Sequence, residues 1–262
     1  YHGDHPLGYR VLGTEQTIKN LTRDAMQRYF DDRYGASTTT VALSGNVDLD
    51  DACRRLEALC GGWPPGGGAP ARAARVPQRG RSELVDERFD RGYLFTLAPG
   101  PAAQSDERYA ASLAAQVLGA SDNSTLHWAL IEQGIAEEAQ AGFEPSDGSG
   151  EFQVFAAGDA DRLPEIESIV QQQTASLAES VTEQDLARIR SRFATSFTVS
   201  AERPSDGMQR LGRRWTMLGE YRSLDEELER IRAVTLDDIA ALLAGDRLTP
   251  WMVGTLRPPS PA

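Results

Sequence analysis

The sequence predicts an α+β fold, in which an antiparallel sheet is layered with helices. Two stretches, residues 136–147 and 150–159, flank the turn PSDGSG and are expected to pair as a hairpin. The other predicted strands are separated by runs of several helices. Strands that pair as a hairpin favour an antiparallel α+β layer over a doubly wound parallel sheet, in which strands and helices alternate.

The length and charge of the chain narrow the class of protein. A chain of 262 residues is long enough for one large domain or two medium ones. No window holds the roughly 20 unbroken apolar residues of a membrane helix, so we expect no membrane partner. The formal net charge of −12 argues against nucleic acid and anionic membrane surfaces as partners, and it suits a basic or neutral peptide.

The first 60 residues are predicted to form a loop, a helix, a strand and a second helix. Thr22 is the expected N-cap of a helix over residues 21–34. The β-branched and apolar stretch TTTVALSGNV, residues 38–47, predicts a strand. The apolar stripe of the first helix consists of Leu21, Ala25, Met26, Tyr29 and Phe30.

The two cysteines, Cys53 and Cys60, lie in the predicted second helix, which Asp48 or Asp50 is expected to cap. Seven residues along a helix correspond to roughly 10 Å, whereas a disulfide needs Cα atoms within about 7 Å. We therefore expect two buried thiols, not a disulfide or a metal site. Unbridged cysteines favour a reducing compartment, which makes the cytoplasm the favoured location.

Residues 61–82 are rich in Gly, Pro and Ala and form the clearest predicted linker. The blocks on either side end alike, because a helix followed by a strand occurs near the end of both. Two copies of one architecture would explain this similarity. We therefore expect residues 1–60 to be the end of a truncated first repeat and residues 83–258 to be a complete second repeat.

The second block is predicted to contain strands in residues 83–100 and 249–256 besides the hairpin, together with several helices. Gly119 is the expected C-cap of the first of these helices, and Gly134 is expected to end the second. Thr182 and Asp185 are spaced as a capping box at the start of a long helix. The predicted helices cover residues 106–119, 124–134, 163–180, 181–203, 205–221, 223–234 and 235–246.

The residues alone predict no self-contained active site. His2 and His5 in HGDH could be metal ligands, but Gly3 and Pro6 interrupt any helix there, so a surface loop is the simpler interpretation. His127 could act as a general base, yet no nucleophile is placed beside it. The sequence contains no phosphate-binding loop, no G-x-S-x-G elbow and no C-x-x-C pair.

The opening of the chain, GDHPLGYRVLGTEQTIKN through to SGNVDLDD, resembles the end of the catalytic half in the pitrilysin/insulinase family of zinc metallopeptidases. The phrases H-P-L-G, L-G-T-E-x-x-I and G-N-V-D occur in the order of that family. The helical run from residue 180 to 239 is similar to the closing helices of the family's second half. Together these matches cover nearly all of residues 1–258.

The resemblance implies two tandem α+β repeats that form a clamshell around an extended peptide. It also implies that the zinc site, an H-x-x-E-H helix with a later Glu, lies before the H-P-L-G phrase, so His2 and His5 would not be ligands. No H-x-x-E-H occurs in this sequence. Zinc is therefore expected in the full-length parent, with none bound by this chain.

The second half of the family usually supplies an Arg and a Tyr, seven residues apart, near the substrate. Aligned on Gly134, these positions fall on Leu130 and Glu137, so both substrate-binding side chains are replaced. A one-residue slip would not restore the pair, because residues 109–161 contain no Arg. The substitutions imply either a different mode of substrate binding or a structural role for this half.

The expected function is that of the C-terminal portion of a zinc metallopeptidase. This portion would be inactive alone, would close the chamber and would help to hold a peptide or protein substrate. Its partner would be the missing N-terminal catalytic half or an active partner subunit. The alternative is a non-catalytic homologue that acts as a scaffold or recognition subunit beside an active partner, and an unrelated α+β binding module is a third possibility.

Overall fold

The computed structural model describes residues 1–67, 75–244 and 248–259. Contacts between Cα atoms divide the chain into two compact units. Unit 1 consists of Tyr1, residues 77–199 and residues 222–262, and unit 2 consists of residues 2–76 and 200–221. Part of the predicted linker, residues 68–74, lies outside the described residues. The three predicted ranges, 1–60, 61–82 and 83–258, remain a prediction.

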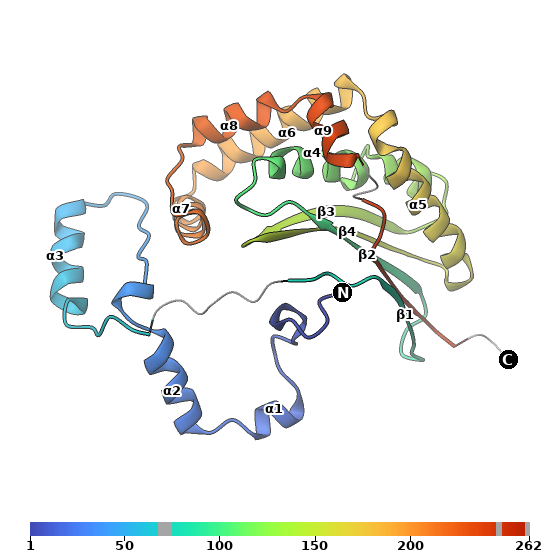
Figure 1. Cartoon of the computed structure of the whole chain (residues 1–262). Helices are drawn as coiled ribbons and strands as arrows, with labels where there is room; N and C mark the ends of the chain where they lie inside the picture. The colour runs from blue at the N-terminus through green and yellow to red at the C-terminus, as the bar shows by residue number, and fades with distance from the viewer. Residues whose placement is uncertain (68–74, 245–247, 260–262) are drawn as a thin grey trace. The chain divides into compact units, whose positions relative to one another are not determined.

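Unit 1 is built on a five-stranded sheet with the order β1-β5-β2-β4-β3 (Figure 1). The α+β prediction is confirmed, and β2 pairs antiparallel with both β4 and β5, as β3 does with β4. The exception is β1, which runs parallel to β5. The strands are β1 Gly80–Val85, β2 Gly92–Gly100, β3 Glu138–Ser146, β4 Ser149–Gly158 and β5 Met252–Arg257.

The helices of unit 1 all lie on one face of this sheet (Figure 1). On β2 and β4 the side chains alternate, so that Leu94, Phe152 and Val154 point into the core beneath the helices. Leu113 of α4 and Ile166 of α5 meet them there, each with 0–1% of its surface exposed. The helices are α4 Glu107–Gly119, α5 Leu163–Ser180, α6 Glu183–Ala201, α8 Leu224–Ala233 and α9 Leu236–Leu243, with the short η3 His127–Ile131 and η4 Ala160–Arg162.

Three of these helices begin with capping boxes, in which a hydroxyl and a carboxylate satisfy free backbone amides. At α6 the predicted box is confirmed, because the amide of Asp185 donates to Thr182 Oγ1 at 3.2 Å and the amide of Thr182 donates to Asp185 Oδ2 at 3.2 Å. Ser223 with Glu226 begins α8 in this way, and Thr235 with Asp238 begins α9.

The predicted C-cap at Gly119 is wrong, although a glycine is needed there. Gly119 is the last residue of α4 and has no positive φ, and Ala120 follows as the cap. A Cβ at position 119 would overlap the backbone nitrogen of Ala141 in β3. The glycine therefore permits the close approach of helix to strand, a tertiary contact that the local sequence does not reveal.

Unit 2 contains four helices in its described residues, and the predicted N-cap Thr22 is confirmed by its acceptance of the Ala25 amide at 3.2 Å. Asp48 caps the helix that carries the cysteines.

The prediction of buried thiols is wrong, since Cys53 is exposed and Cys60 half-buried, although both are free. The helices are α1 Glu15–Lys19, α2 Arg23–Arg33, α3 Leu49–Cys60 and α7 Pro204–Leu218, with short 3₁₀ turns at Pro6–Gly8 and Ala36–Thr38.

The strand predicted for residues 38–47 is not formed in this chain. Residues 39–44 have no regular secondary structure and pair with no strand. The segment lies against α7, because a Cβ at Gly207 would reach Ser44 Oγ at 2.8 Å and one at Gly212 would reach Ala42 Cβ at 3.3 Å. A strand needs a partner strand to complete its backbone hydrogen bonds. The described part of unit 2 contains no strand that could pair with this segment.

Unit 2 also leaves its predicted apolar stripe exposed. Leu21, Met26, Tyr29 and Phe30 each keep more than half of their surface accessible. An amphipathic helix normally buries such a stripe.

The helices in the described parts of both units were compared with the length and hydropathy of a membrane span, and none of them reaches both.

We predict that Gly119→Ala destabilises unit 1 by about 2 kcal/mol, because the added methyl group forces α4 away from β3. Gly254→Ala is the matched control, since its Cβ would meet only the Phe95 carbonyl, at an ordinary 3.6 Å. The control should change the free energy of unfolding by less than about 0.5 kcal/mol. Urea denaturation followed by circular dichroism measures both values. Equal unfolding midpoints for the two variants would contradict the close approach.

The capping boxes predict how stability depends on pH. Hydrogen bonds from Thr182 and Thr235 lower the pKa values of Asp185 and Asp238 in the folded chain. A lowered folded pKa gives stability that is present above the unfolded pKa of about 4 and is lost as pH falls through the folded value. Asp185→Asn and Asp238→Asn should therefore flatten the decline of the urea midpoint below about pH 4. An unchanged slope in the double variant would refute this assignment.

Candidate functional site

The two positions predicted to match a substrate-binding pair lie in different environments. Leu130 belongs to the π-helical turn η3 and is 0% exposed in the core. Its carbonyl accepts the amides of Ile135 and Ala136 after the turn, which Gly134 ends as predicted with φ +63°. A fully buried leucine in this setting contributes packing and presents no group to a ligand.

Glu137 immediately precedes β3, and its side chain is 58% exposed. Its carboxylate forms an ion pair with Arg91 at 2.7 Å, and Arg91 also pairs with Asp159. A second arginine, Arg162, donates to the Gly134 carbonyl at 2.7 Å. Two arginines from outside residues 130–137 therefore contact this segment, Arg91 at Glu137 and Arg162 at Gly134. The sequence of the segment itself does not reveal these contacts.

The histidines have structural partners. His5 Nδ1 accepts the amide of Leu7 at 3.2 Å, as an N-cap does. His127 Nε2 lies 3.1 Å from Glu132 Oε1, and the ring stands edge-on to Trp128. Within residues 1–67, 75–244 and 248–259, no three His, Cys, Asp or Glu side chains are grouped closely enough to hold a metal ion.

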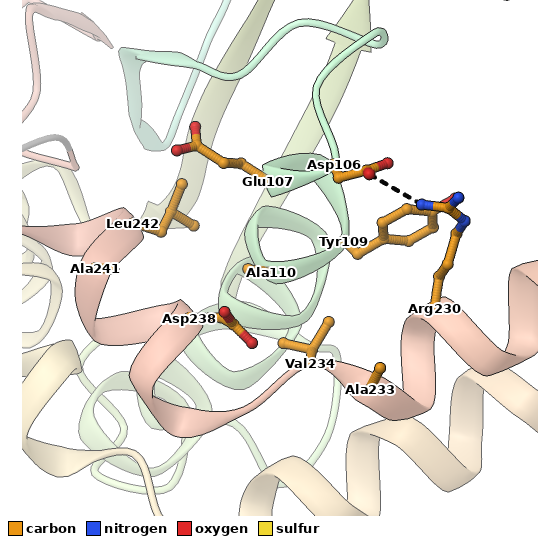
Figure 2. A pocket seen from close by; sticks show the side chains of 10 residues that line it. All are labelled: Asp106, Glu107, Tyr109, Ala110, Arg230, Ala233, Val234, Asp238, Ala241 and Leu242. Atoms are coloured by element: carbon orange, nitrogen blue, oxygen red, sulfur yellow. Dashed lines mark hydrogen bonds and ion pairs between the residues drawn. The ribbon is translucent and has the colours of Figure 1, made fainter.

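A groove of about 400 Å³ lies on the helical layer where α4 meets α8 and α9 (Figure 2). Figure 2 shows the Asp106 carboxylate directed at the guanidinium of Arg230, and the two groups are 2.9 Å apart. Behind it, Tyr109 donates to buried Glu227 at 2.8 Å and accepts from Arg108 at 2.7 Å. These polar groups satisfy one another, so the groove is best explained as a helix junction.

The sheet face opposite the helices has a different character. The register places Tyr93, Phe95 and Leu97 of β2 on this face, with Phe155 of β4 beside Phe95. These side chains are partly exposed, and Phe95 keeps 41% of its surface accessible. Their outward direction follows from strand alternation, since their neighbours Leu94 and Thr96 fill the core.

A depression of about 460 Å³ opens on this helix-free face. Phe89 meets Tyr93 edge-on with ring centroids 5.7 Å apart, and Tyr93 lies 6.2 Å from Phe155. An aromatic wall of this kind binds apolar groups. The lining residues are Ser82, Phe89, Tyr93, Phe95, Phe155, Gly254, Thr255 and Leu256.

The sequence did not point to this depression. Tyr93, Phe95 and Phe155 could be recognised as strand residues, but alternation alone does not say which face remains uncovered. Gly254 lies in β5, far along the chain, and meets β2 only through the sheet order. One signal could have identified this face. Both faces of β2 carry apolar side chains, whereas a strand that covers a single core needs them on one face only.

Comparison with known proteins identifies the family. The family profile described as "Peptidase M16 inactive domain" matches residues 20–193. An uncharacterized zinc protease of Streptomyces coelicolor is 28% identical and covers 97% of this chain. The uncharacterized zinc protease YmxG of Bacillus subtilis is 24% identical and covers 92%. The chain spans only 58% and 59% of the lengths of these two relatives.

Solved structures show the same fold at low sequence identity. A peptidase M16 inactive domain from Pseudomonas fluorescens gives a TM-score of 0.90 at 18% identity, over 98% of this chain and 62% of that one. A chain of complex III from Candida albicans gives 0.85 at 20% identity, over 96% and 62%. With two thirds of its residues matched by the family profile, the chain belongs to the peptidase M16 family, the pitrilysin/insulinase group of zinc metallopeptidases.

Proposed function

We propose that this chain is the C-terminal portion of a zinc metallopeptidase and that it closes the peptide-binding chamber of its parent. The observation that carries the proposal is the match to an M16 inactive domain in a chain that spans 58% of a relative named as a zinc protease. The remaining length of such a relative provides room for a catalytic half. The zinc would belong to that half, because this sequence contains no H-x-x-E-H.

Two features of unit 2 support a missing partner segment. The stripe of Leu21, Met26, Tyr29 and Phe30 is exposed, which is costly for a helix in water. Residues 39–44 have a strand-like composition without a strand partner. A sheet contributed by the parent's N-terminal half would supply both a ladder for this segment and a cover for α2.

In the parent, zinc would supply an activated water for peptide hydrolysis. This chain would contribute surface that holds an extended peptide and excludes bulk solvent. Its helix-free sheet face suits that role, because it presents apolar side chains to the open side of unit 1.

The alternative is a non-catalytic homologue that serves as a scaffold or recognition subunit beside an active partner. The environments of Leu130 and Glu137 favour it. Neither position presents an Arg or Tyr side chain, and Glu137 is engaged by Arg91. Determining the coding frame upstream of Tyr1 separates the two functions, since only an active parent would encode H-x-x-E-H and a later Glu.

We predict that the purified chain retains no stoichiometric zinc after dialysis and cleaves no peptide. Mixing it with the N-terminal region from the same frame should raise peptidase activity at least about tenfold above either part alone. Elemental analysis and hydrolysis of a quenched fluorescent peptide measure these outcomes. Stoichiometric zinc in this chain alone would contradict the proposal, as would full activity of the N-terminal region without it.

A matched test uses the exposed stripe of α2. Tyr29→Glu with Phe30→Glu should abolish the gain in activity on mixing, because two carboxylates cannot be buried against an apolar surface. Gln27→Glu with Arg28→Glu adds charge to the same helix next to the stripe and serves as the control. Equal gains with both double variants would show that α2 is not the contact surface.

A further inference from the structure

The turn between β3 and β4 carries an Asp-Gly pair at its tip. Ser146 pairs with Ser149 in the sheet, so Asp147 and Gly148 form a two-residue loop. Both loop residues are exposed, and Gly148 has φ +71°, a conformation that favours glycine. Glycine also leaves its own backbone nitrogen unshielded, because it has no side chain. The hairpin therefore places an unshielded amide directly after a carboxyl group, at the surface.

A side chain from a distant loop contacts both members of this pair. Gln104, between β2 and α4, donates from Nε2 to Asp147 Oδ1 at 2.7 Å. Its Oε1 accepts the amide of Gly148 at 3.1 Å. The amide of Ala103 also donates to the Ser146 carbonyl at 2.9 Å, so the backbone holds the same loop against the turn. One glutamine thus binds the two groups that can react with each other.

The reaction open to an Asp-Gly pair is isomerisation through a succinimide. The Gly148 nitrogen attacks Cγ of the Asp147 carboxylic acid and forms a C–N bond, while the amide proton and the acid hydroxyl leave together as one water. A second water then adds to the ring. Cleavage of the new Cγ–N bond restores aspartate. Cleavage of the original peptide bond leaves isoaspartate, whose main chain is longer by one methylene group, with no net change in mass or oxidation state.

The contacts of Gln104 oppose the first step of this reaction. The nitrogen of Gly148 must give up its proton and approach Cγ, whereas Gln104 Oε1 accepts that proton's hydrogen bond and Nε2 holds the carboxylate. Each net hydrogen bond changes the population of an arrangement roughly fivefold. We propose that Asp147-Gly148 is a site of spontaneous aspartate isomerisation and that Gln104 slows the reaction. This inference does not depend on the proposed function.

A second Asp-Gly pair provides an internal reference. The sequence contains only one other, Asp206-Gly207, which lies in α7. The amide of Gly207 donates to the Arg203 carbonyl at 3.1 Å, and the Asp206 carboxylate pairs with Arg203 at 3.1 Å. Because a helix keeps this amide in its own hydrogen bonding, we expect Asp206 to react slowly whether or not Gln104 is present.

The test incubates the full purified chain in water enriched in oxygen-18. Each passage through the succinimide adds one heavy oxygen to the aspartate, and mass spectrometry after digestion in ordinary water follows Asp147 and Asp206 separately. Gln104→Ala should speed labelling of Asp147 at least about fivefold and leave Asp206 unchanged. Gln140→Ala is the matched control, since it replaces an exposed glutamine of β3 that donates to Glu138 and not to the turn. The control should label as the parent chain does.

The same measurement on the parent chain in concentrated urea needs no variant, so the proposal stays testable even if Gln104→Ala fails to fold. Unfolding removes both contacts of Gln104 and should speed labelling of Asp147 at least about fivefold. Equal rates at Asp147 in the folded and unfolded parent would overturn the proposal. Equal rates at Asp147 in the folded parent and in folded Gln104→Ala would overturn it as well.

Discussion

The architecture of unit 1 depends on the backbone ladder of β5. This strand comes from the end of the chain and lies between β1 and β2, so it supplies hydrogen bonds to two strands that are not adjacent to each other. Without β5, β1 would lose its partner, and β2 would become an edge strand. The same insertion places Gly254 between Phe95 and Ser82 and so creates the depression on the helix-free face. The fold and the depression therefore share one cause.

The opposite face is held by a second long-range constraint. Tyr109 of α4 donates to Glu227 of α8, 118 residues later, while Arg108 and Arg222 donate to the Tyr109 oxygen. A buried carboxylate is tolerated only when such partners compensate for its lost hydration. The network connects α8 to α4, the helix that packs on β3. The network thereby holds α4 and α8 together, and the described helices of unit 1 lie on one side of the sheet, away from the aromatic face (Figure 1).

Local signals in the sequence were sufficient for most elements of unit 1 and insufficient for the site. The capping box at Thr182, the hairpin before residue 159 and the range of α5 follow from periodicity and turn chemistry, which act over a few residues. Gly119 was placed correctly at a helix end for the wrong reason, because its role is a contact with Ala141. The prediction of a strand at residues 38–47 was wrong, because a strand forms only beside a partner strand. The composition of a segment does not show whether such a partner is present. Leu130 and Glu137 could be located by alignment on Gly134, but burial and the ion pair with Arg91 are tertiary facts.

The division of the chain into units has a consequence for covalent connectivity. The chain passes between the units at residues 1–2, 76–77, 199–200 and 221–222, because α7 is contributed to unit 2 from within the sequence of unit 1. A single cut in the Gly- and Pro-rich segment would thus leave each unit joined to the other by peptide bonds elsewhere. Neither unit is one consecutive piece of sequence, so a truncation made within the Gly- and Pro-rich segment would divide unit 2 itself.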